Sequence, residues 1–170
     1  EIKREYRALV VGTLTAGGRI DLPIGRHPTQ RTRMAVNPMG RPSVTHFRVL
    51  EHFRKHTLLK VILETGRTHQ IRVHMAYLRH PVFGDPVYGG RLSLPPGADD
   101  ALKSVLRGFH RQALLAKRLQ LVHPISGRPM RFECAIPPDM REVLDALAAD
   151  ADRHWHDPEF DDVGFDDWDD

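Results

Sequence analysis

A strand-like stretch that ends in a glycine turn constrains this fold more than any other feature of the sequence. Residues 57–64, Thr-Leu-Leu-Lys-Val-Ile-Leu-Glu, are typical of a strand with a buried face. Thr-Gly-Arg at residues 65–67 then breaks the pattern, Thr68 is a suitable N-cap, and a helix can continue until Pro81 stops it. We therefore expect a strand that turns directly into a helix, with Arg72 in the first turns of that helix.

The other regular elements are mainly strands. Alternating and β-branched residues predict the strands, and apolar residues at helical spacing predict two further helices. The expected strands cover residues 5–14, 43–53, 117–122 and 130–136, and the expected helices cover residues 102–109 and 140–147, the last with Met140, Val143, Leu144 and Leu147 buried. Because strands and helices do not alternate regularly, we predict an α+β fold with a mixed, mostly antiparallel sheet and flanking helices.

Charge is unevenly distributed along the chain. Residues 157–170 hold eight acids and no Lys or Arg, and removing their −8 from the total of +3 leaves +11 for residues 1–156. A body this basic suits a polyanion such as RNA, although a solvated basic surface would give the same composition. The 170 residues have room for a single core. We expect one domain at residues 1–150 and a disordered acidic tail at residues 151–170.

The sequence shows no sign of membrane insertion or export. It has no run of about 18 apolar residues and no charged-then-apolar leader, so we expect a cytoplasmic protein, and a monomer. The chain begins at Glu1 rather than at a methionine and runs at once into a strand-like stretch. We expect it to be a piece of a longer protein.

Metal and nucleotide chemistry have little support in the sequence. His69 and His74 are five residues apart, about 140° around a helix, so they would face different directions. The glycine pairs at residues 17–18 and 89–90 lack the Walker lysine and the dinucleotide spacing. The single cysteine, Cys134, lies in an apolar stretch and is expected to be a buried, inert thiol. We predict neither a metal site nor a nucleotide cofactor.

Two basic segments are candidates for binding an anionic partner. At the helix start, Arg67, His69 and Gln70 lie beside free backbone N–H groups and the positive end of the helix dipole. An ordinary capped and solvated first turn is the alternative. The second segment is the irregular stretch at residues 25–33, which could contact phosphates or simply be a soluble loop. Its basic side chains are Arg26, His27, Arg31 and Arg33.

Five specific motifs follow one another along the chain. They are Ile-Gly-Arg-His-Pro at 24–28, Thr-Gly-Arg-Thr-His-Gln-Ile-Arg-Val-His-Met-Ala at 65–76, His-Pro at 80–81 with Gly-Asp-Pro-Val-Tyr-Gly-Gly at 84–90, Arg-Gln-Ala-Leu at 111–114, and His-Pro-Ile-Ser-Gly at 123–127. With these motifs the chain resembles the RluA-type family of pseudouridine synthases. The resemblance runs in family order from about residue 5 to residue 140 and covers most of the chain.

The resemblance implies the C-terminal part of a pseudouridine synthase catalytic domain, which isomerises uridine in large-subunit ribosomal RNA without a cofactor. An aspartate attacks the uridine, the glycosidic bond breaks, and the base rotates and rejoins the ribose through carbon. By resemblance, Arg72 pairs with that aspartate, Tyr6 stacks on the target base, and Leu114 forms an apolar wall of the uracil pocket. The implied RNA contacts are Arg67, His69, Gln70, Arg26, His27, Arg31 and Arg33.

The chain also departs from the family pattern. The family nucleophile lies in an Arg-Leu-Asp motif upstream of the tyrosine segment, and no Arg-Leu-Asp occurs here. The similar Arg-Ile-Asp at residues 19–21 lies downstream of Tyr6, and Leu115 stands where a histidine often follows Arg-Gln-Ala-Leu. We therefore expect this chain alone to be inactive. The alternatives are a non-catalytic RNA-binding module of the same fold and a basic protein-interaction fragment.

Overall fold

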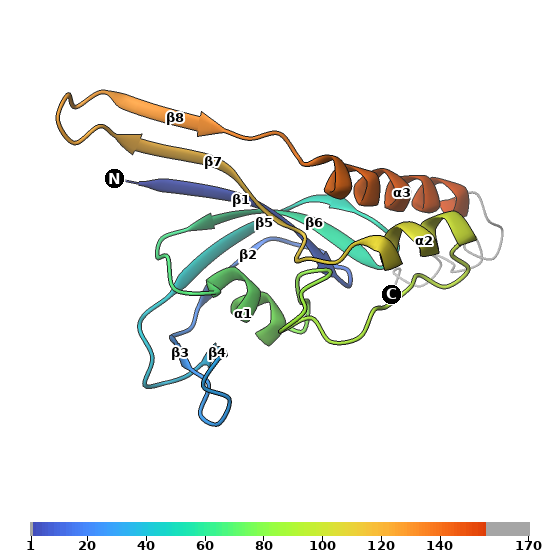
Figure 1. The fold of residues 1–170 in the computed structure, drawn as a ribbon, viewed down its shortest axis with the longest axis horizontal. Helices are drawn as coiled ribbons and strands as arrows, with labels where there is room; N and C mark the ends of the chain where they lie inside the picture. The colour runs from blue at the N-terminus through green and yellow to red at the C-terminus, as the bar shows by residue number, and fades with distance from the viewer. Residues whose placement is uncertain (1, 156–170) are drawn as a thin grey trace, which may run out of the picture.

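A six-stranded sheet organises the computed structural model, which describes residues 2–155. The strands lie in the order β2-β5-β6-β1-β7-β8, and two short strands, β3 and β4, pair separately (Figure 1). The strands are β1 (Lys3–Val11), β2 (Gly18–Asp21), β3 (Ile24–Arg26), β4 (Met34–Val36), β5 (Val44–His52), β6 (His56–Leu63), β7 (Leu114–Val122) and β8 (Pro129–Glu133), and the helices are α1 (Gln70–Tyr77), α2 (Asp100–Gly108) and α3 (Pro138–Trp155). The predicted α+β class with a mostly antiparallel sheet is confirmed. Every pair of these strands is antiparallel, so the described residues do not include the parallel pair that a mixed sheet would need.

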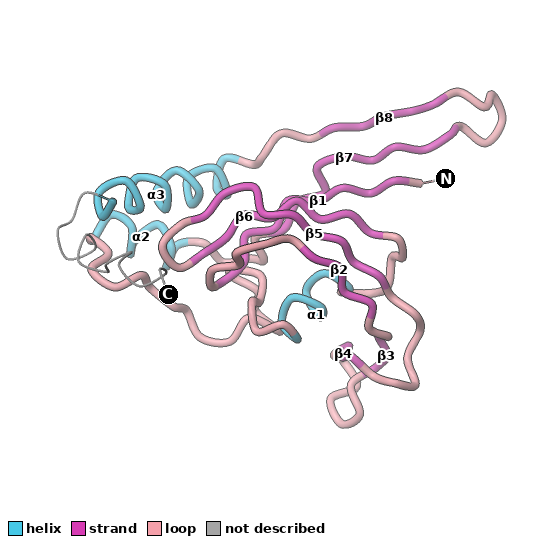
Figure 2. Tube along the Cα trace, turned by 180° about the vertical axis from the view of Figure 1, so that it is seen from behind, coloured by secondary structure: helices cyan, strands magenta, loops and turns pink. Residues whose placement is uncertain are grey.

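Strand β1 runs through the hydrophobic core. Residues 8–10 are fully buried between β6 and β7. Helices α2 and α3 pack together at one end of the sheet, and the β7–β8 hairpin extends from the other end (Figures 1 and 2). As its apolar spacing predicted, α3 buries Met140, Val143, Leu144 and Leu147. Full burial of such a side chain contributes about 1.5–3 kcal/mol, so this face fixes the helix to the core.

Alternation along the strands separates two faces of the sheet. Tyr6 lies opposite Val61, which lies opposite Phe47, so these three side chains share one face, called here the Tyr6 face. Helix α1 packs on this face, because Nδ1 of its His74 lies 2.8 Å from the hydroxyl of Thr45, two residues before Phe47. The opposite face, called here the Arg7 face, carries Arg7, Lys60 and Arg48.

The start of α1 differs from the prediction. The helix begins at Gln70, and its N-cap is His69 rather than Thr68. His69 has φ 56° and ψ 24°, in the left-handed region, and its side chain makes no capping hydrogen bond. The side-chain oxygen of Gln70 instead accepts a hydrogen bond from the backbone N–H of Arg67 at 3.0 Å. Gln70 therefore satisfies a backbone N–H group before the helix from a position inside it, and Thr68 does not act as the N-cap.

Three further expectations need correction. Residues 25 and 26 belong to β3 rather than to a loop, because they pair with β4. Cys134 is exposed rather than buried, because it follows the edge strand β8, whose one neighbour among the described strands is β7. Helix α3 continues to Trp155, beyond the expected domain end at residue 150. The rest of the expected acidic tail, residues 156–170, lies outside the described residues.

Candidate functional site

A buried ion pair lies at the start of α1. Nε of Arg72 donates to Oδ2 of Asp85 at 2.8 Å, and Nη2 donates to Oδ1 at 2.9 Å. Oδ1 also accepts hydrogen bonds from the backbone N–H groups of Val87 at 2.9 Å and Tyr88 at 3.1 Å. Burial alone would raise the pKa of Asp85, but the hydrogen bonds from Arg72 and the two amides outweigh it and lower the pKa below its usual value. Asp85 therefore stays ionised and fixes the guanidinium.

Tyr88 connects this ion pair to β4 and to the N-cap of α1. Its hydroxyl oxygen accepts the backbone N–H of Met34, the first residue of β4, at 3.0 Å, and lies 2.9 Å from Nδ1 of His69. Its ring centroid is 5.0 Å from Cζ of Arg72, within cation–π range. Burial lowers the pKa of His69, the nearby charge of Arg72 lowers it further, and Asp85 opposes both. The net lowering of the pKa favours the neutral form of His69.

The side chain of Gln70 forms hydrogen bonds across the junction between β6 and α1. The side chain is buried, and its oxygen accepts from the hydroxyl of Thr65 and the backbone N–H of Arg67. Its side-chain nitrogen donates to the carbonyl of Val44 and the hydroxyl of Thr45, both at 3.0 Å. All four hydrogen-bonding positions of the amide are thus filled by the protein. The geometry gives Gln70 a structural function at this junction, and the substrate contact expected from the sequence stays a prediction.

Tyr6 and Leu114 lie on the Tyr6 face. Both are half-buried, and Leu114 is opposite Ala8, two residues after Tyr6. Arg4 projects from the same face, because it lies two residues before Tyr6. Its guanidinium packs against Gly66, where a side chain would collide with it. The sheet therefore brings Tyr6 and Leu114 to the face that α1 covers, with Arg4 beside the glycine turn.

The predicted basic side chains of residues 26–33 gather on and beside the β3–β4 loop, residues 27–33. Nη1 of Arg26 donates to the carbonyl of Arg31 at 3.1 Å, and the backbone N–H of His27 donates to the carbonyl of Arg33 at 2.9 Å. Nδ1 of His27 accepts backbone N–H groups within the loop, which stiffens the turn. Arg31 is exposed and Arg33 is half-buried. Arg67, at the other predicted segment, donates from Nε to the carbonyl of Pro42.

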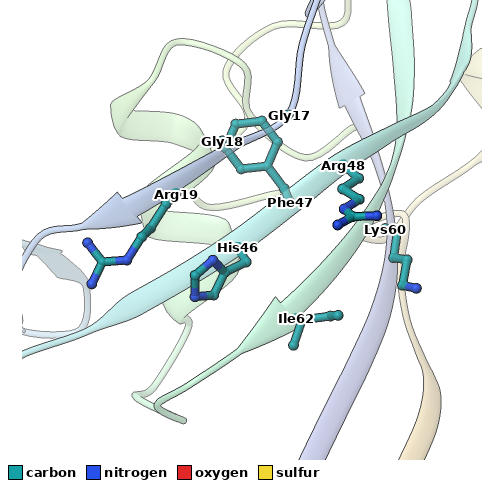
Figure 3. A pocket seen from close by; sticks show the side chains of 8 residues that line it. All are labelled: Gly17, Gly18, Arg19, His46, Phe47, Arg48, Lys60 and Ile62. Atoms are coloured by element: carbon teal, nitrogen blue, oxygen red, sulfur yellow. The ribbon is translucent and has the colours of Figure 1, made fainter.

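A basic hollow of about 750 Å³ is lined by residues in and beside β2, β5 and β6, including Arg48 and Lys60 of the Arg7 face (Figure 3). Its lining residues are Gly17, Gly18, Arg19, His46, Phe47, Arg48, Lys60 and Ile62. Arg19 and Lys60 each lie 3.2 Å from a carboxylate, and His46 lies 3.4 Å from another. These neighbouring acids balance much of the hollow's charge, and the hollow is not part of the site around Arg72.

Residues 2–155 contain neither a metal-ligand cluster nor a membrane-spanning helix. No three or more His, Cys, Asp or Glu side chains come together there in a way that could hold a metal ion. His69 and His74 have different partners, since His74 lies 2.8 Å from both Thr45 and the carbonyl oxygen of Leu22. None of the helices in this part of the chain combines the length and hydropathy needed to cross a membrane.

Comparison with known proteins relates the chain to one family. Residues 1–77 match the family described as RNA pseudouridylate synthase. Curated relatives at 56% to 59% identity extend the similarity to about 90% of the chain. Ribosomal large subunit pseudouridine synthase D of Escherichia coli (strain K12) is 59% identical over 154 residues, which are 91% of this chain and 47% of that protein. The protein of that name from Vibrio vulnificus (strain CMCP6) is 56% identical over 153 residues, which are 90% of this chain and 47% of that protein. The chain spans about half the length of these relatives.

Two solved structures share the fold. Human RNA Pseudouridylate Synthase Domain Containing 4 has a TM-score of 0.67 at 22% identity, and the match covers 86% of this chain and 62% of that one. Human RNA Pseudouridylate Synthase Domain Containing 1 has a TM-score of 0.63 at 24% identity, over 87% of this chain and 66% of that one. At these identities the likeness shows the fold alone.

Sequence reasoning gave no function to two residues of the site, Asp85 and Tyr88. Both lie in the Gly-Asp-Pro-Val-Tyr-Gly-Gly motif, where an aspartate before a proline predicts a turn capped by its own carboxylate. The two backbone N–H bonds to Asp85 match that signal. Nothing in the sequence around Asp85 indicated that its partner would be Arg72, which lies 13 residues earlier in the chain.

Proposed function

We propose that this chain provides part of the active site of an RNA pseudouridine synthase that acts on large-subunit ribosomal RNA. The observation that carries the proposal is the setting of Arg72. Asp85 occupies Nε and Nη2 of its guanidinium, and no hydrogen bond from Nη1 is found among the described residues. An arginine held in this way is oriented and permanently charged, so its remaining N–H groups suit a second carboxylate. The proposed second carboxylate is the nucleophilic aspartate.

The proposed reaction is an isomerisation that needs no cofactor. The carboxylate attacks the uridine, the bond between the ribose and N1 breaks, the base rotates, a bond between the ribose and C5 forms, and the bond between the carboxylate and the substrate breaks. The proton lost from C5 is matched by one gained at N1, so all atoms are conserved. Pairing with Arg72 keeps the nucleophile ionised, because a nearby opposite charge lowers the pKa of a carboxyl group. Tyr6 and Leu114, on the same sheet face, are proposed to stack on the target base and to line its pocket.

RNA binding is proposed to use the β3–β4 loop and the start of α1. Arg31 is exposed and Arg33 half-buried on the loop, and guanidinium groups suit phosphate contacts. Arg67 and His69 extend the same basic region at the helix start. The relatives are named ribosomal large subunit pseudouridine synthases, which supports large-subunit ribosomal RNA as the partner, and hence the cytoplasm as the compartment.

The test compares two arginines in a chain extended upstream through an Arg-Leu-Asp segment. Tritium released from C5 of labelled uridine in a fragment of large-subunit ribosomal RNA measures turnover. Arg72→Met should lower turnover about a hundredfold or more, because it removes the group that orients the nucleophile. Arg107→Met, on the exposed surface of α2, should not change it. Full turnover by a folded Arg72→Met protein would contradict the proposal, and thermal unfolding verifies that each variant is folded.

A second candidate function is RNA binding without catalysis. The lack of an Arg-Leu-Asp sequence in residues 1–170 favours it. The encoded sequence upstream of Glu1 discriminates between the two functions. An Arg-Leu-Asp about 20 to 40 residues earlier, the spacing expected for neighbouring sheet elements, supports the enzyme. Its absence supports the binding module.

A further inference from the structure

We propose that Tyr88 is a positioning residue that couples the basic β3–β4 loop to His69 and Arg72. The inference rests on the proposed function, because it takes the loop and His69 as RNA contacts. Its basis is that one side chain contacts two elements at three points: the first residue of β4, the N-cap of α1, and the guanidinium in the first turn of α1.

The hydroxyl of Tyr88 is shared between the loop and the helix cap. Its oxygen accepts the backbone N–H of Met34, which lies 54 residues earlier in the chain, at 3.0 Å. A phenol oxygen that accepts one hydrogen bond still has its own proton to donate. Nδ1 of His69 lies 2.9 Å away, in position to receive it. In that arrangement the ring proton of neutral His69 is on Nε2, which leaves Nε2 as a donor for RNA.

The position of His69 shows why the hydroxyl matters. His69 and Arg79 are the two non-glycine residues with positive φ in the described part of the chain. A left-handed backbone is costly for a histidine and persists where surrounding contacts fix it. The side chain of His69 makes no capping hydrogen bond. Among the described residues, its ring has one hydrogen-bond partner, the hydroxyl of Tyr88. Tyr88 therefore fixes the direction of the imidazole.

The rest of Tyr88 contacts the ion pair. Its ring centroid lies 5.0 Å from Cζ of Arg72, and its backbone N–H donates to Oδ1 of Asp85 at 3.1 Å. Movement of the loop against Tyr88 therefore reaches both the imidazole and the guanidinium. RNA bound to the loop would hold the side chains of His69 and Arg72 in a single orientation.

Tyr88→Phe tests this coupling, because it removes the hydroxyl and retains the ring beside Arg72. The matched control is Tyr77→Phe, on the exposed side of α1, where Tyr77 is 57% accessible. Binding of a uridine-rich RNA stem-loop to the 170-residue chain should weaken about threefold to tenfold in Tyr88→Phe, as expected for one lost hydrogen bond. Tyr77→Phe should change it less than about twofold. Equal affinities of the two variants would overturn the proposal.

A double-mutant cycle with Arg33→Ala separates coupling from a general loss of stability. If Tyr88 acts through the loop, the loss caused by Tyr88→Phe becomes smaller once Arg33 is absent. Simple addition of the two losses would show that Tyr88 does not act through the loop.

Two NMR signals distinguish failure of this inference from failure of the proposed function. Tyr88→Phe should shift the Nδ1 resonance of His69 and speed amide exchange of Met34, whereas Tyr77→Phe should leave both unchanged. If the unaltered chain fails to bind the stem-loop, the proposed function is overturned together with the RNA part of this inference. Unchanged His69 and Met34 signals in Tyr88→Phe overturn the positioning function itself, whatever the RNA affinity.

Discussion

Arg72 and Asp85 form a buried ion pair through two parallel hydrogen bonds of 2.8 and 2.9 Å. The side chain of Asp85 is inaccessible to solvent, and that of Arg72 is 10% accessible. Such a pair contributes little net stability when both partners are present, but loss of one partner leaves an uncompensated buried charge. The pair therefore couples the orientation of Arg72 to the stability of the fold.

Asp85→Asn should destabilise the protein by about 3 kcal/mol or more, since it leaves the Arg72 charge buried and unpaired. The matched control is Asp139→Asn. Asp139 makes the same two-bond contact with Arg111, but both side chains are more than 40% accessible. An exposed pair is typically worth about 1 kcal/mol or less. Urea unfolding measures both changes, and similar losses in the two variants would contradict the burial argument.

His56 should make the protein sensitive to mild acid. Its ring is buried with no hydrogen-bond partner for either nitrogen, and burial lowers its pKa to about 4, against a smaller opposing effect of Asp150. The unfolded chain, with an ordinary histidine pKa of about 6.5, takes up a proton first as the pH falls. The contribution of neutral, buried His56 to the free energy of unfolding is therefore fully present above about pH 6.5 and is lost as the pH falls toward 4.

His56→Leu tests this pH dependence. Between pH 7.5 and 4.5 its free energy of unfolding should fall less than that of the unaltered protein, by up to about 3 kcal/mol. His110→Leu, at an exposed position, is the control and should keep the original pH dependence. If His56→Leu loses as much stability in acid as the unaltered protein, the buried histidine is not the source of acid sensitivity.

Charge reversal tests the proposed RNA-binding surface. Arg33→Glu, on the β3–β4 loop, should weaken binding of an RNA stem-loop about tenfold and reduce the slope of log affinity against log salt by about one. Arg48→Glu makes the same change at a residue of the Arg7 face that lines the hollow (Figure 3) and should have a smaller effect. A larger loss for Arg48→Glu would assign RNA binding to the opposite face.

The regular elements could be predicted because their signals are local. The run from residue 57 to residue 64 and the apolar face of residues 140–147 follow from side-chain periodicity, which β6 and α3 confirm. The edge position of β8, which exposes Cys134, follows from sheet order, and an apolar sequence pattern carries no information about that order.

The candidate site was only partly predictable, because its contacts join distant segments. Family motifs indicated Arg72 and His69, but not the left-handed cap at His69 or the hydrogen bond that Gln70 accepts from the backbone N–H of Arg67. Tyr88 meets Met34 across 54 residues, and Asp85 meets Arg72 across 13. Such partners are fixed by tertiary packing rather than by any residue spacing.

We propose that this chain contains the arginine half of a uridine-isomerising site and lacks the nucleophile. Tritium release from C5-labelled uridine in a fragment of large-subunit ribosomal RNA, measured with residues 1–170 alone, tests it most directly. We expect salt-sensitive RNA binding without tritium release. Sustained release by this chain alone would contradict the claim, because the nucleophile would then have to lie within these 170 residues.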